Sequence, residues 1–210
     1  MVATALAVTS PNGRQLTKAA AVVVRSKSKR QSLPEYLEKP QIDSLYSVLA
    51  DPRHRLHFLL QWRAGLRVAE ACGLSAADLF LEGEHPTLKV RRGKGNRARI
   101  VPVHEELRTA LMAFTSFGDR RQAASLLGVS ASQAWRWVQA AYKRAVAAGK
   151  MPAGRRIGTH TLRHSAARHW LLSGVPINVV SRWLGHSNLA TTLIYLAIVP
   201  DVEGFMDRVT

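Results

Sequence analysis

The fold is indicated by one stretch of the sequence, GTHTLRHSAARHWLLSGVPINVVSRWLGHSNLATTLIY at residues 158–195. Helix-breaking residues divide this stretch: Gly174 closes a first helix, Pro176 opens a second at its first position, and Gly185 ends the second. Ser187 or Asn188 is placed to cap a third helix, which carries Tyr195 about two turns in. The stretch therefore predicts three short helices joined by tight turns.

Four side chains of this stretch suit the chemistry of a phosphate group. His160 and Arg163 are three residues apart, so on a helix they point the same way. A guanidinium group binds two phosphate oxygens at once, and an imidazole holds or passes a proton near neutral pH. The hydroxyl of Tyr195 is a potential covalent nucleophile once its proton is removed. With His186 directly after the second helix, the three helices are expected to gather these groups around one point.

The same stretch resembles the tyrosine recombinase (phage integrase) family. The resemblance rests on T-H-T-L-R-H at 159–164, L-G-H-S at 184–187 and T-T-x-x-Y at 191–195, whose order and spacing are specific. It implies a mainly α-helical domain with a small antiparallel β-sheet, an α+β fold of the tyrosine recombinase catalytic-domain type. The similarity covers about residues 40–200.

The composition indicates a polyanionic partner. The 210 residues include 30 Lys and Arg against 14 Asp and Glu, a formal net charge of +16, and nucleic acid is the first candidate. A hydrophobic content of 47% is sufficient for a folded core. We expect no membrane-spanning segment and no signal peptide. The single cysteine, Cys72, excludes an internal disulfide and fits a reducing compartment, so a cytoplasmic, nucleoid-associated protein is expected.

Two regions are expected. Residues 1–34 read as a basic, flexible N-terminal tail, which is either solvated or follows DNA through phosphate contacts. Residues 35–210 form the catalytic domain that the resemblance implies. The N-terminal core-binding domain usual in the family has no counterpart here, so the chain is interpreted as a minimal recombinase or a catalytic fragment.

Asp51-Pro52 predicts the cap and first position of a helix that Gly65 ends, and the segment G-L-R-V-A-E at 65–70 then places Arg67 at a helix junction. By itself, Arg67 is compatible with an ordinary surface charge. In the family, the arginine of a G-L-R-x-x-E segment is the first catalytic arginine, and the resemblance gives this role to Arg67. It also makes Glu70 a supporting acid that orients its basic neighbours.

Residues 79–102 predict strands at 79–81, 87–91 and 99–101, separated by turns. The second turn is strongly basic, either a cationic hairpin that enters a DNA groove or a solvated loop that contacts phosphates. The pattern G-K-G-N-x-x-x-x-V-P is similar to the family segment that bears the catalytic lysine, here Lys94, whose ammonium group suits a general acid. The candidate DNA contacts of this hairpin are Arg91, Arg92, Arg97 and Arg99.

Residues 119–148 allow two interpretations. Their small and apolar residues are spaced as in a helix-turn-helix with Gly128 in the turn, so that 119–127 is helical and Gln133 and Arg136 face bases. Alternatively, 130–148 is the single long helix that the family has before its H-x-x-R segment. Both interpretations allow contact with DNA.

The resemblance implies one reaction. Arg67 and Arg163 hold the non-bridging oxygens of a DNA phosphodiester. His160 takes the tyrosine proton or positions the hydroxyl, and His186 donates a hydrogen bond to a phosphate oxygen. The tyrosine attacks phosphorus to give a 3′-phosphotyrosine, and the lysine protonates the departing 5′-oxygen. The catalytic set is Arg67, Lys94, His160, Arg163, His186 and Tyr195.

This chemistry conserves the energy of the broken bond, so no cofactor is expected. The acids are scattered and none lies in 158–195, which argues against a two-metal site. The implied partner is double-stranded DNA, bound at paired sites by a homotetramer, with accessory proteins as further partners. The chain after Tyr195 is expected to pack on a neighbouring protomer or on its own domain.

The alternatives are a type IB topoisomerase-like enzyme and a non-catalytic helix-turn-helix regulator that uses Gln133 and Arg136. The remaining histidines are interpreted as surface or packing residues: His54, His57, His85, His104, His164 and His169.

Overall fold

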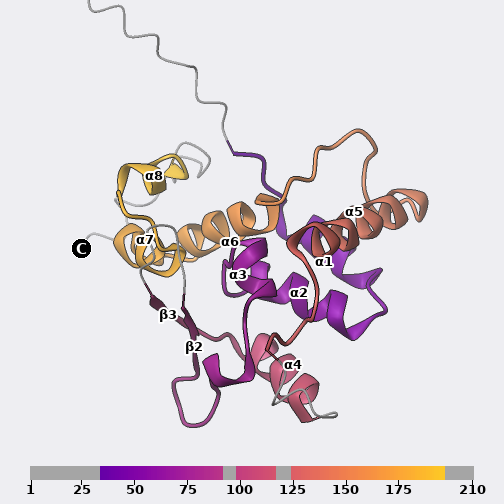
Figure 1. Cartoon of the computed structure of the whole chain (residues 1–210). Coiled ribbons are helices and arrows are strands. Elements are labelled where there is room, and N and C mark those ends of the chain that lie inside the picture. Colours follow the sequence, from indigo (N-terminus) through magenta and orange to yellow (C-terminus); the bar gives the residue numbers. More distant parts are fainter. Residues whose placement is uncertain (1–33, 92–97, 117–123, 197–210) are drawn as a thin grey trace, which may run out of the picture. The chain divides into compact units, whose positions relative to one another are not determined.

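The computed structural model describes residues 34–91, 98–116 and 124–196. They form a mainly helical domain with one three-stranded antiparallel sheet (Figure 1), which confirms the predicted fold class. The helices are α1 (Lys39–Ser47), α2 (Pro52–Trp62), α3 (Val68–Cys72), α4 (Glu105–Ser116), α5 (Ala131–Ala147), α6 (Thr161–Leu172), α7 (Ile177–Leu184) and α8 (Ala190–Leu193). A 3-10 turn, η1 (Ala76–Asp78), precedes strands β1 (Leu79–Phe80), β2 (Thr87–Val90) and β3 (Arg99–Pro102).

Helix α2 is the centre of the hydrophobic core. Asp51 caps its N-terminus by accepting a 2.7 Å hydrogen bond from the Arg53 backbone amide, and Pro52 is its first residue, as predicted. The helix contacts α3, α4, α5 and α6. Its side chains from Leu56 to Trp62 are all buried, because neighbouring helices cover it on several sides.

The sheet is a meander in the order β1-β2-β3. Leu88 of β2 pairs with Leu79 on one side and with Val101 on the other, and neither Leu88 nor Val101 is exposed. Strand β3 also contacts α7, so the sheet lies beside the C-terminal helices (Figure 1). The turn between β2 and β3, which contains Lys94, Arg92 and Arg97, lies outside the described residues.

The structure favours the single long helix over the helix-turn-helix. Residues 124–127 are not helical, contrary to the helix predicted over 119–127, and 117–123 lie outside the described residues. The Leu126 amide donates a 2.8 Å hydrogen bond to the Leu74 carbonyl, which draws this backbone onto the end of α3 instead. Helix α5 is continuous over 17 residues and exposes Gln133 and Arg136.

The C-terminal helices follow the predicted pattern with two differences. Gly174 and Gly185 have φ of +84° and +66°, the left-handed conformation that ends a helix. Pro176 occupies the capping position before α7 and not its first helical position. Asn188 accepts a 2.9 Å hydrogen bond from the Ala190 amide, but α8 ends at Leu193, so Tyr195 follows the helix rather than lying within it.

His57 of α2 gives a prediction about stability. The side chain is 0% exposed, and neither ring nitrogen has a hydrogen-bond partner among the described residues. Burial, followed by the nearby charge of His54, lowers the pKa of His57 from 6.5 to about 4. Between these values the unfolded chain binds a proton that the native protein does not. The free energy of unfolding should therefore fall as pH falls from about 6.5 towards 4, by up to about 3 kcal/mol from this group.

The variant His57→Leu should weaken this pH dependence, because it removes the titrating ring without leaving a polar partner unsatisfied. Urea unfolding of the wild type and the variant at about pH 7 and about pH 5 measures the difference. The same loss of stability in both proteins would contradict the assignment.

Candidate active site

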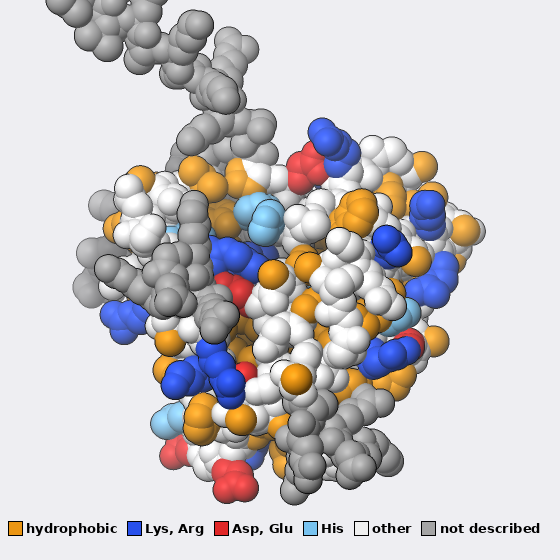
Figure 2. All heavy atoms as spheres, in the orientation of Figure 1, with side chains coloured by type: hydrophobic (Ala, Val, Ile, Leu, Met, Phe, Trp, Pro, Cys, Tyr) orange, Lys and Arg blue, Asp and Glu red, His pale blue; other side chains and the backbone are white. Residues whose placement is uncertain are grey.

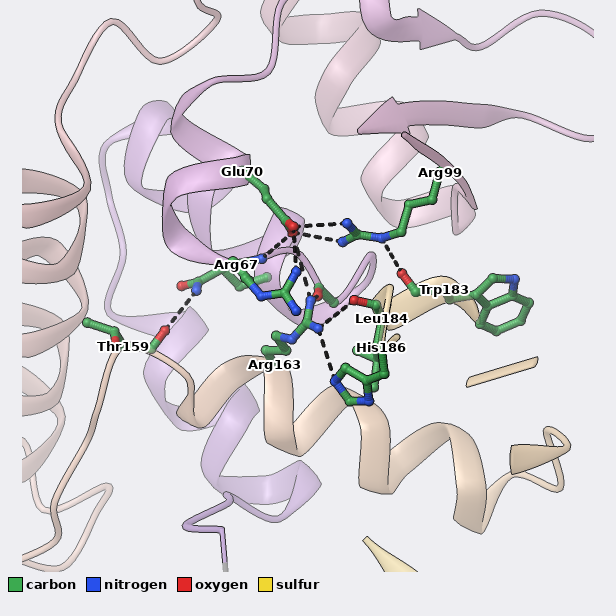
Figure 3. A network of polar contacts seen from close by, with 10 residues as sticks. Arg67, Glu70, Arg99, Thr159, Arg163, Trp183, Leu184 and His186 are labelled. Atoms are coloured by element: carbon green, nitrogen blue, oxygen red, sulfur yellow. Dashed lines mark hydrogen bonds and ion pairs between the residues drawn. The ribbon is translucent and has the colours of Figure 1, made fainter. Parts of the chain in front are cut away.

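Glu70 of α3 is the centre of a buried network of ion pairs (Figure 3). Arg99 donates to both of its carboxylate oxygens, at 2.9 and 2.7 Å, and Arg67 donates to Oε1 at 2.7 Å. Nη1 of Arg163 lies 3.8 Å from Oε2. Burial alone would raise the pKa of Glu70, but the hydrogen bonds and charge of Arg99, and then the hydrogen bonds from Arg67, lower it to about 2. Three guanidinium groups surround one carboxylate, so the network has an excess of positive charge.

Arg163 of α6 connects this network to two turns of the chain. Its side chain is 3% exposed, and it donates 2.6 Å hydrogen bonds to the carbonyls of Gly65 and Leu184. Burial, and then the charge of Arg67, lowers its pKa to about 9, which leaves the guanidinium charged at neutral pH. Gly65 has φ of +61°, and a Cβ there would lie 2.7 Å from the Trp170 ring, so glycine is required where this turn meets α6.

His186 lies between Arg163 and Tyr195. Its Nε2 is 3.3 Å from Nη2 of Arg163, and its Nδ1 is 2.8 Å from the Thr192 hydroxyl. Its ring is stacked on that of Tyr195, with 6.4 Å between centroids and 10° between planes. Burial, and then the charge of Arg163, lowers the pKa of His186 to about 4, so the ring is neutral at neutral pH. Nε2 then accepts from Arg163, while Nδ1 donates to Thr192.

Tyr195 is 1% exposed and packs with Ala167, Val180 and Leu184. Its hydroxyl lies 2.7 Å from Nδ1 of His164. Burial raises the pKa of Tyr195, and the positive charge of Arg163 opposes this effect in part. The phenol is therefore protonated at neutral pH and sequestered from solvent in this arrangement.

His164 is a site residue that the sequence analysis missed. It was interpreted as a surface or packing residue, and His160 was expected at the tyrosine hydroxyl. Burial, and then His160, lowers the pKa of His164 to about 4, so its neutral ring can accept the hydrogen bond from Tyr195. Its position four residues after His160, on the same helix face, was the available signal.

His160 and Arg67 open onto a groove of about 930 Å³. His160 is exposed at the start of α6, and its pKa is lowered by partial burial and then by the charges of Arg163 and Arg67. On the face drawn in Figure 2, basic, acidic and histidine side chains meet in a hollow. Lys89 and Arg91 also line the groove. The positive charge of these basic residues suits the binding of an anionic phosphate backbone.

The other expected DNA contacts have different surroundings. Arg91 is 57% exposed and forms an ion pair with Asp78, while Gln133 and Arg136 are exposed on α5. Arg99 differs from the surface residue expected of a DNA contact: its side chain is 8% exposed and bound to Glu70. Lys94, which the resemblance makes catalytic, cannot be placed, because it lies outside the described residues.

Within the described parts of the chain, no three or more His, Cys, Asp or Glu side chains gather as a metal site would require. None of the helices over the same residues has the length and apolarity needed to cross a bilayer.

Comparison with known proteins assigns the family. The model of the Phage integrase family matches residues 35–200. Tyrosine recombinase XerA of Thermococcus onnurineus is 35% identical over 180 residues, which cover 80% of this chain and 60% of that protein. Tyrosine recombinase XerC of Thermodesulfovibrio yellowstonii is 31% identical over 195 residues, covering 82% and 61% of the two chains. The chain thus spans about three fifths of the length of these relatives.

Solved structures agree with this assignment. A crystal structure of XerA recombinase matches with a TM-score of 0.65 and 27% identity, over 78% of this chain and 60% of that one. The catalytic domain of bacteriophage HP1 integrase shares the fold, with a TM-score of 0.62 and 23% identity, over 82% of this chain and 91% of that one. The chain belongs to the phage integrase family.

Proposed function

We propose that the protein is a site-specific DNA recombinase that cleaves and rejoins strands through a 3′-phosphotyrosine intermediate. The observation that carries this proposal is the continuous contact from the arginine network to a tyrosine: Arg163 lies against His186, and His186 stacks on Tyr195. The names of the similar proteins, tyrosine recombinases XerA and XerC, support the same chemistry.

In the proposed reaction, the guanidinium groups of Arg67 and Arg163 bind the non-bridging oxygens of one phosphodiester. They stabilise the charge that develops as the Tyr195 oxygen bonds to phosphorus. The bond from phosphorus to the 5′-oxygen breaks, and Lys94 gives this oxygen a proton. A neutral histidine receives the tyrosine proton, and the family resemblance assigns this role to His160.

Tyr195 must leave its buried position for this attack, since it is 1% exposed whereas the groove at Arg67 is open. Release of the hydroxyl from His164 is therefore part of the proposed reaction. Tyr195 lies after the end of α8 at Leu193, so its displacement does not require α6 to unfold.

The proposed intermediate keeps the phosphoester bond energy, so attack by a 5′-hydroxyl of another strand rejoins DNA without a nucleotide cofactor. We infer that the working assembly is a homotetramer on paired double-stranded sites, with accessory proteins as further partners. It would act in the cytoplasm on nucleoid DNA. The exposed basic residues Arg91, Arg136 and Lys89 would contribute phosphate contacts that weaken as salt increases.

A trapping experiment tests the proposal. The protein is incubated with a library of genomic duplexes that are nicked near each candidate site, so that cleavage releases a short fragment and cannot be reversed. Denaturing electrophoresis should show a covalent protein–DNA adduct that forms without nucleotide and in the presence of EDTA. Failure to trap an adduct on any duplex, or an adduct that requires a divalent metal, would overturn the proposal.

A separate assay, the relaxation of supercoiled plasmid, distinguishes a recombinase from a topoisomerase-like enzyme. A topoisomerase-like enzyme would relax plasmid that lacks paired sites, whereas the proposed recombinase would require them.

A further inference from the structure

Arg99, the first residue of β3, has contacts that the proposed reaction does not use. Its guanidinium donates three hydrogen bonds: two to the oxygens of Glu70, at 2.9 and 2.7 Å, and one from Nε to the Trp183 carbonyl, at 2.7 Å (Figure 3). The side chain is 8% exposed. A planar fork with several donors is needed for this geometry, because it spans a carboxylate and a carbonyl at once.

The Trp183 carbonyl belongs to the last turn of α7, where helix carbonyls lack intrahelical partners. The next carbonyl, that of Leu184, accepts a 2.6 Å hydrogen bond from Arg163. Two successive carbonyls are thus bound by two arginines, one from β3 and one from α6. Both arginines also approach Glu70, at 2.7 and 3.8 Å. Positive charge at the C-terminal end of a helix is favourable.

The chain then passes directly over Arg99. Gly185 has φ of +66°, and a Cβ at this position would lie 2.9 Å from Cδ of Arg99 and 3.1 Å from its Nε. The Trp183 ring packs edge-on against Trp170 of α6, with 5.4 Å between centroids. Arg99 packs on one side of this turn and the Trp170–Trp183 pair on the other. These contacts therefore limit where the backbone turns at Gly185 and where His186 lies.

We propose that Arg99 is a positioning residue. By donating hydrogen bonds to both Glu70 and the Trp183 carbonyl, it fixes the end of α7, and with it His186, relative to Arg67. The inference rests on the proposed function, because the position of His186 relative to Arg67 matters for a phosphate bound by these groups. It replaces the expectation that Arg99 contacts DNA. It also connects the strand that follows the Lys94 turn to the C-terminal helices through one side chain.

Three variants test the inference. Arg99→Lys is decisive, because it keeps a positive charge beside Glu70, and thereby the fold, but cannot reproduce the three hydrogen bonds. Arg99→Ala removes the charge as well. Arg53→Ala is the control for the loss of a surface arginine, since it deletes one that is 48% exposed and lies at the start of α2. The rate of adduct formation at saturating nicked duplex is measured together with the DNA affinity of each protein.

We expect Arg99→Lys to lower the adduct rate by roughly 10²-fold, the effect of a displacement of about 1 Å. Its DNA affinity should stay within the range of the Arg53→Ala control. Guanidinium ion at concentrations that do not denature the protein should restore part of the rate of Arg99→Ala. A wild-type rate in Arg99→Lys would overturn the inference. So would a variant whose only defect is weaker DNA binding, because that result indicates a phosphate contact.

Hydrogen exchange separates this inference from the proposed function. The amides of residues 181–188 should exchange faster in Arg99→Lys than in wild type or Arg53→Ala, while those of α5 remain unchanged. If wild type forms no adduct but this local change is seen, the proposed function fails and the positioning contact stands. If wild type forms an adduct, but Arg99→Lys alters neither its rate nor the exchange of 181–188, the positioning role fails.

Discussion

We expect Tyr195→Phe to abolish the covalent protein–DNA adduct, because the proposed nucleophile is the phenol oxygen. The variant keeps the ring that packs with Ala167, Val180 and Leu184 and loses only the hydroxyl that contacts His164. Because no other atom replaces this oxygen, the loss should be complete at any duplex concentration. Denaturing electrophoresis with a nicked duplex that traps the wild type measures it.

A folded, DNA-binding variant is required for this result to be meaningful. The lost hydrogen bond should cost about 1 kcal/mol of stability, and DNA affinity should be unchanged within a few-fold. Tyr142→Phe is the matched control, because its hydroxyl also forms hydrogen bonds, at 3.0 Å to the Pro152 carbonyl and at 2.8 Å from the Arg155 amide. Tyr142→Phe should form adduct at the wild-type rate. An adduct formed by Tyr195→Phe would exclude this oxygen as the nucleophile.

Arg163→Ala should lower the rate of adduct formation by roughly 10²–10³-fold, the usual cost of removing one preorganised donor from a transition state. Arg163→Lys should recover only part of this loss, since a single ammonium group cannot replace a guanidinium that donates to the carbonyls of Gly65 and Leu184 and, in the proposed reaction, also binds a phosphate. Single-turnover rates at saturating duplex separate this effect from a change in affinity.

Stability must be measured alongside, because Arg163→Ala leaves two buried carbonyls without their donor, at roughly 1–3 kcal/mol each. Arg168→Ala, on the same helix, is the matched control. It removes an arginine of similar burial that pairs with Glu38 at 2.8 Å. If the rates of Arg163→Ala and Arg168→Ala fall equally relative to wild type, the change reports loss of folding and not of catalysis.

Local sequence signals predicted much of the fold, because helix caps and alternating strands depend on near neighbours. Asp51, Gly174 and Gly185 act where the sequence placed them. The helix predicted over 119–127 was wrong for its described part, since Leu126 forms a backbone hydrogen bond with Leu74, more than fifty residues earlier. A contact at this separation leaves no periodic trace in the sequence.

The candidate site was likewise predictable from the sequence only in part. Arg67, Glu70, Arg163 and His186 were predicted from motifs, and the structure brings them into one network. The role of Arg99 was not predictable, because an arginine beside a basic turn resembles a DNA contact until α7 is seen to pack over it. The contact of His164 with Tyr195 was missed for a related reason: it depends on how the chain returns after α8.

The chemistry of the trapped link tests the central claim most directly. The adduct is digested with protease and nuclease, and the modified peptide is analysed by mass spectrometry with fragmentation to locate the modified residue. We expect a nucleotide joined through its 3′-phosphate to Tyr195, while the released strand carries a free 5′-hydroxyl that polynucleotide kinase labels. A link to any other residue, or a 5′-phosphate on the released strand, would contradict the account.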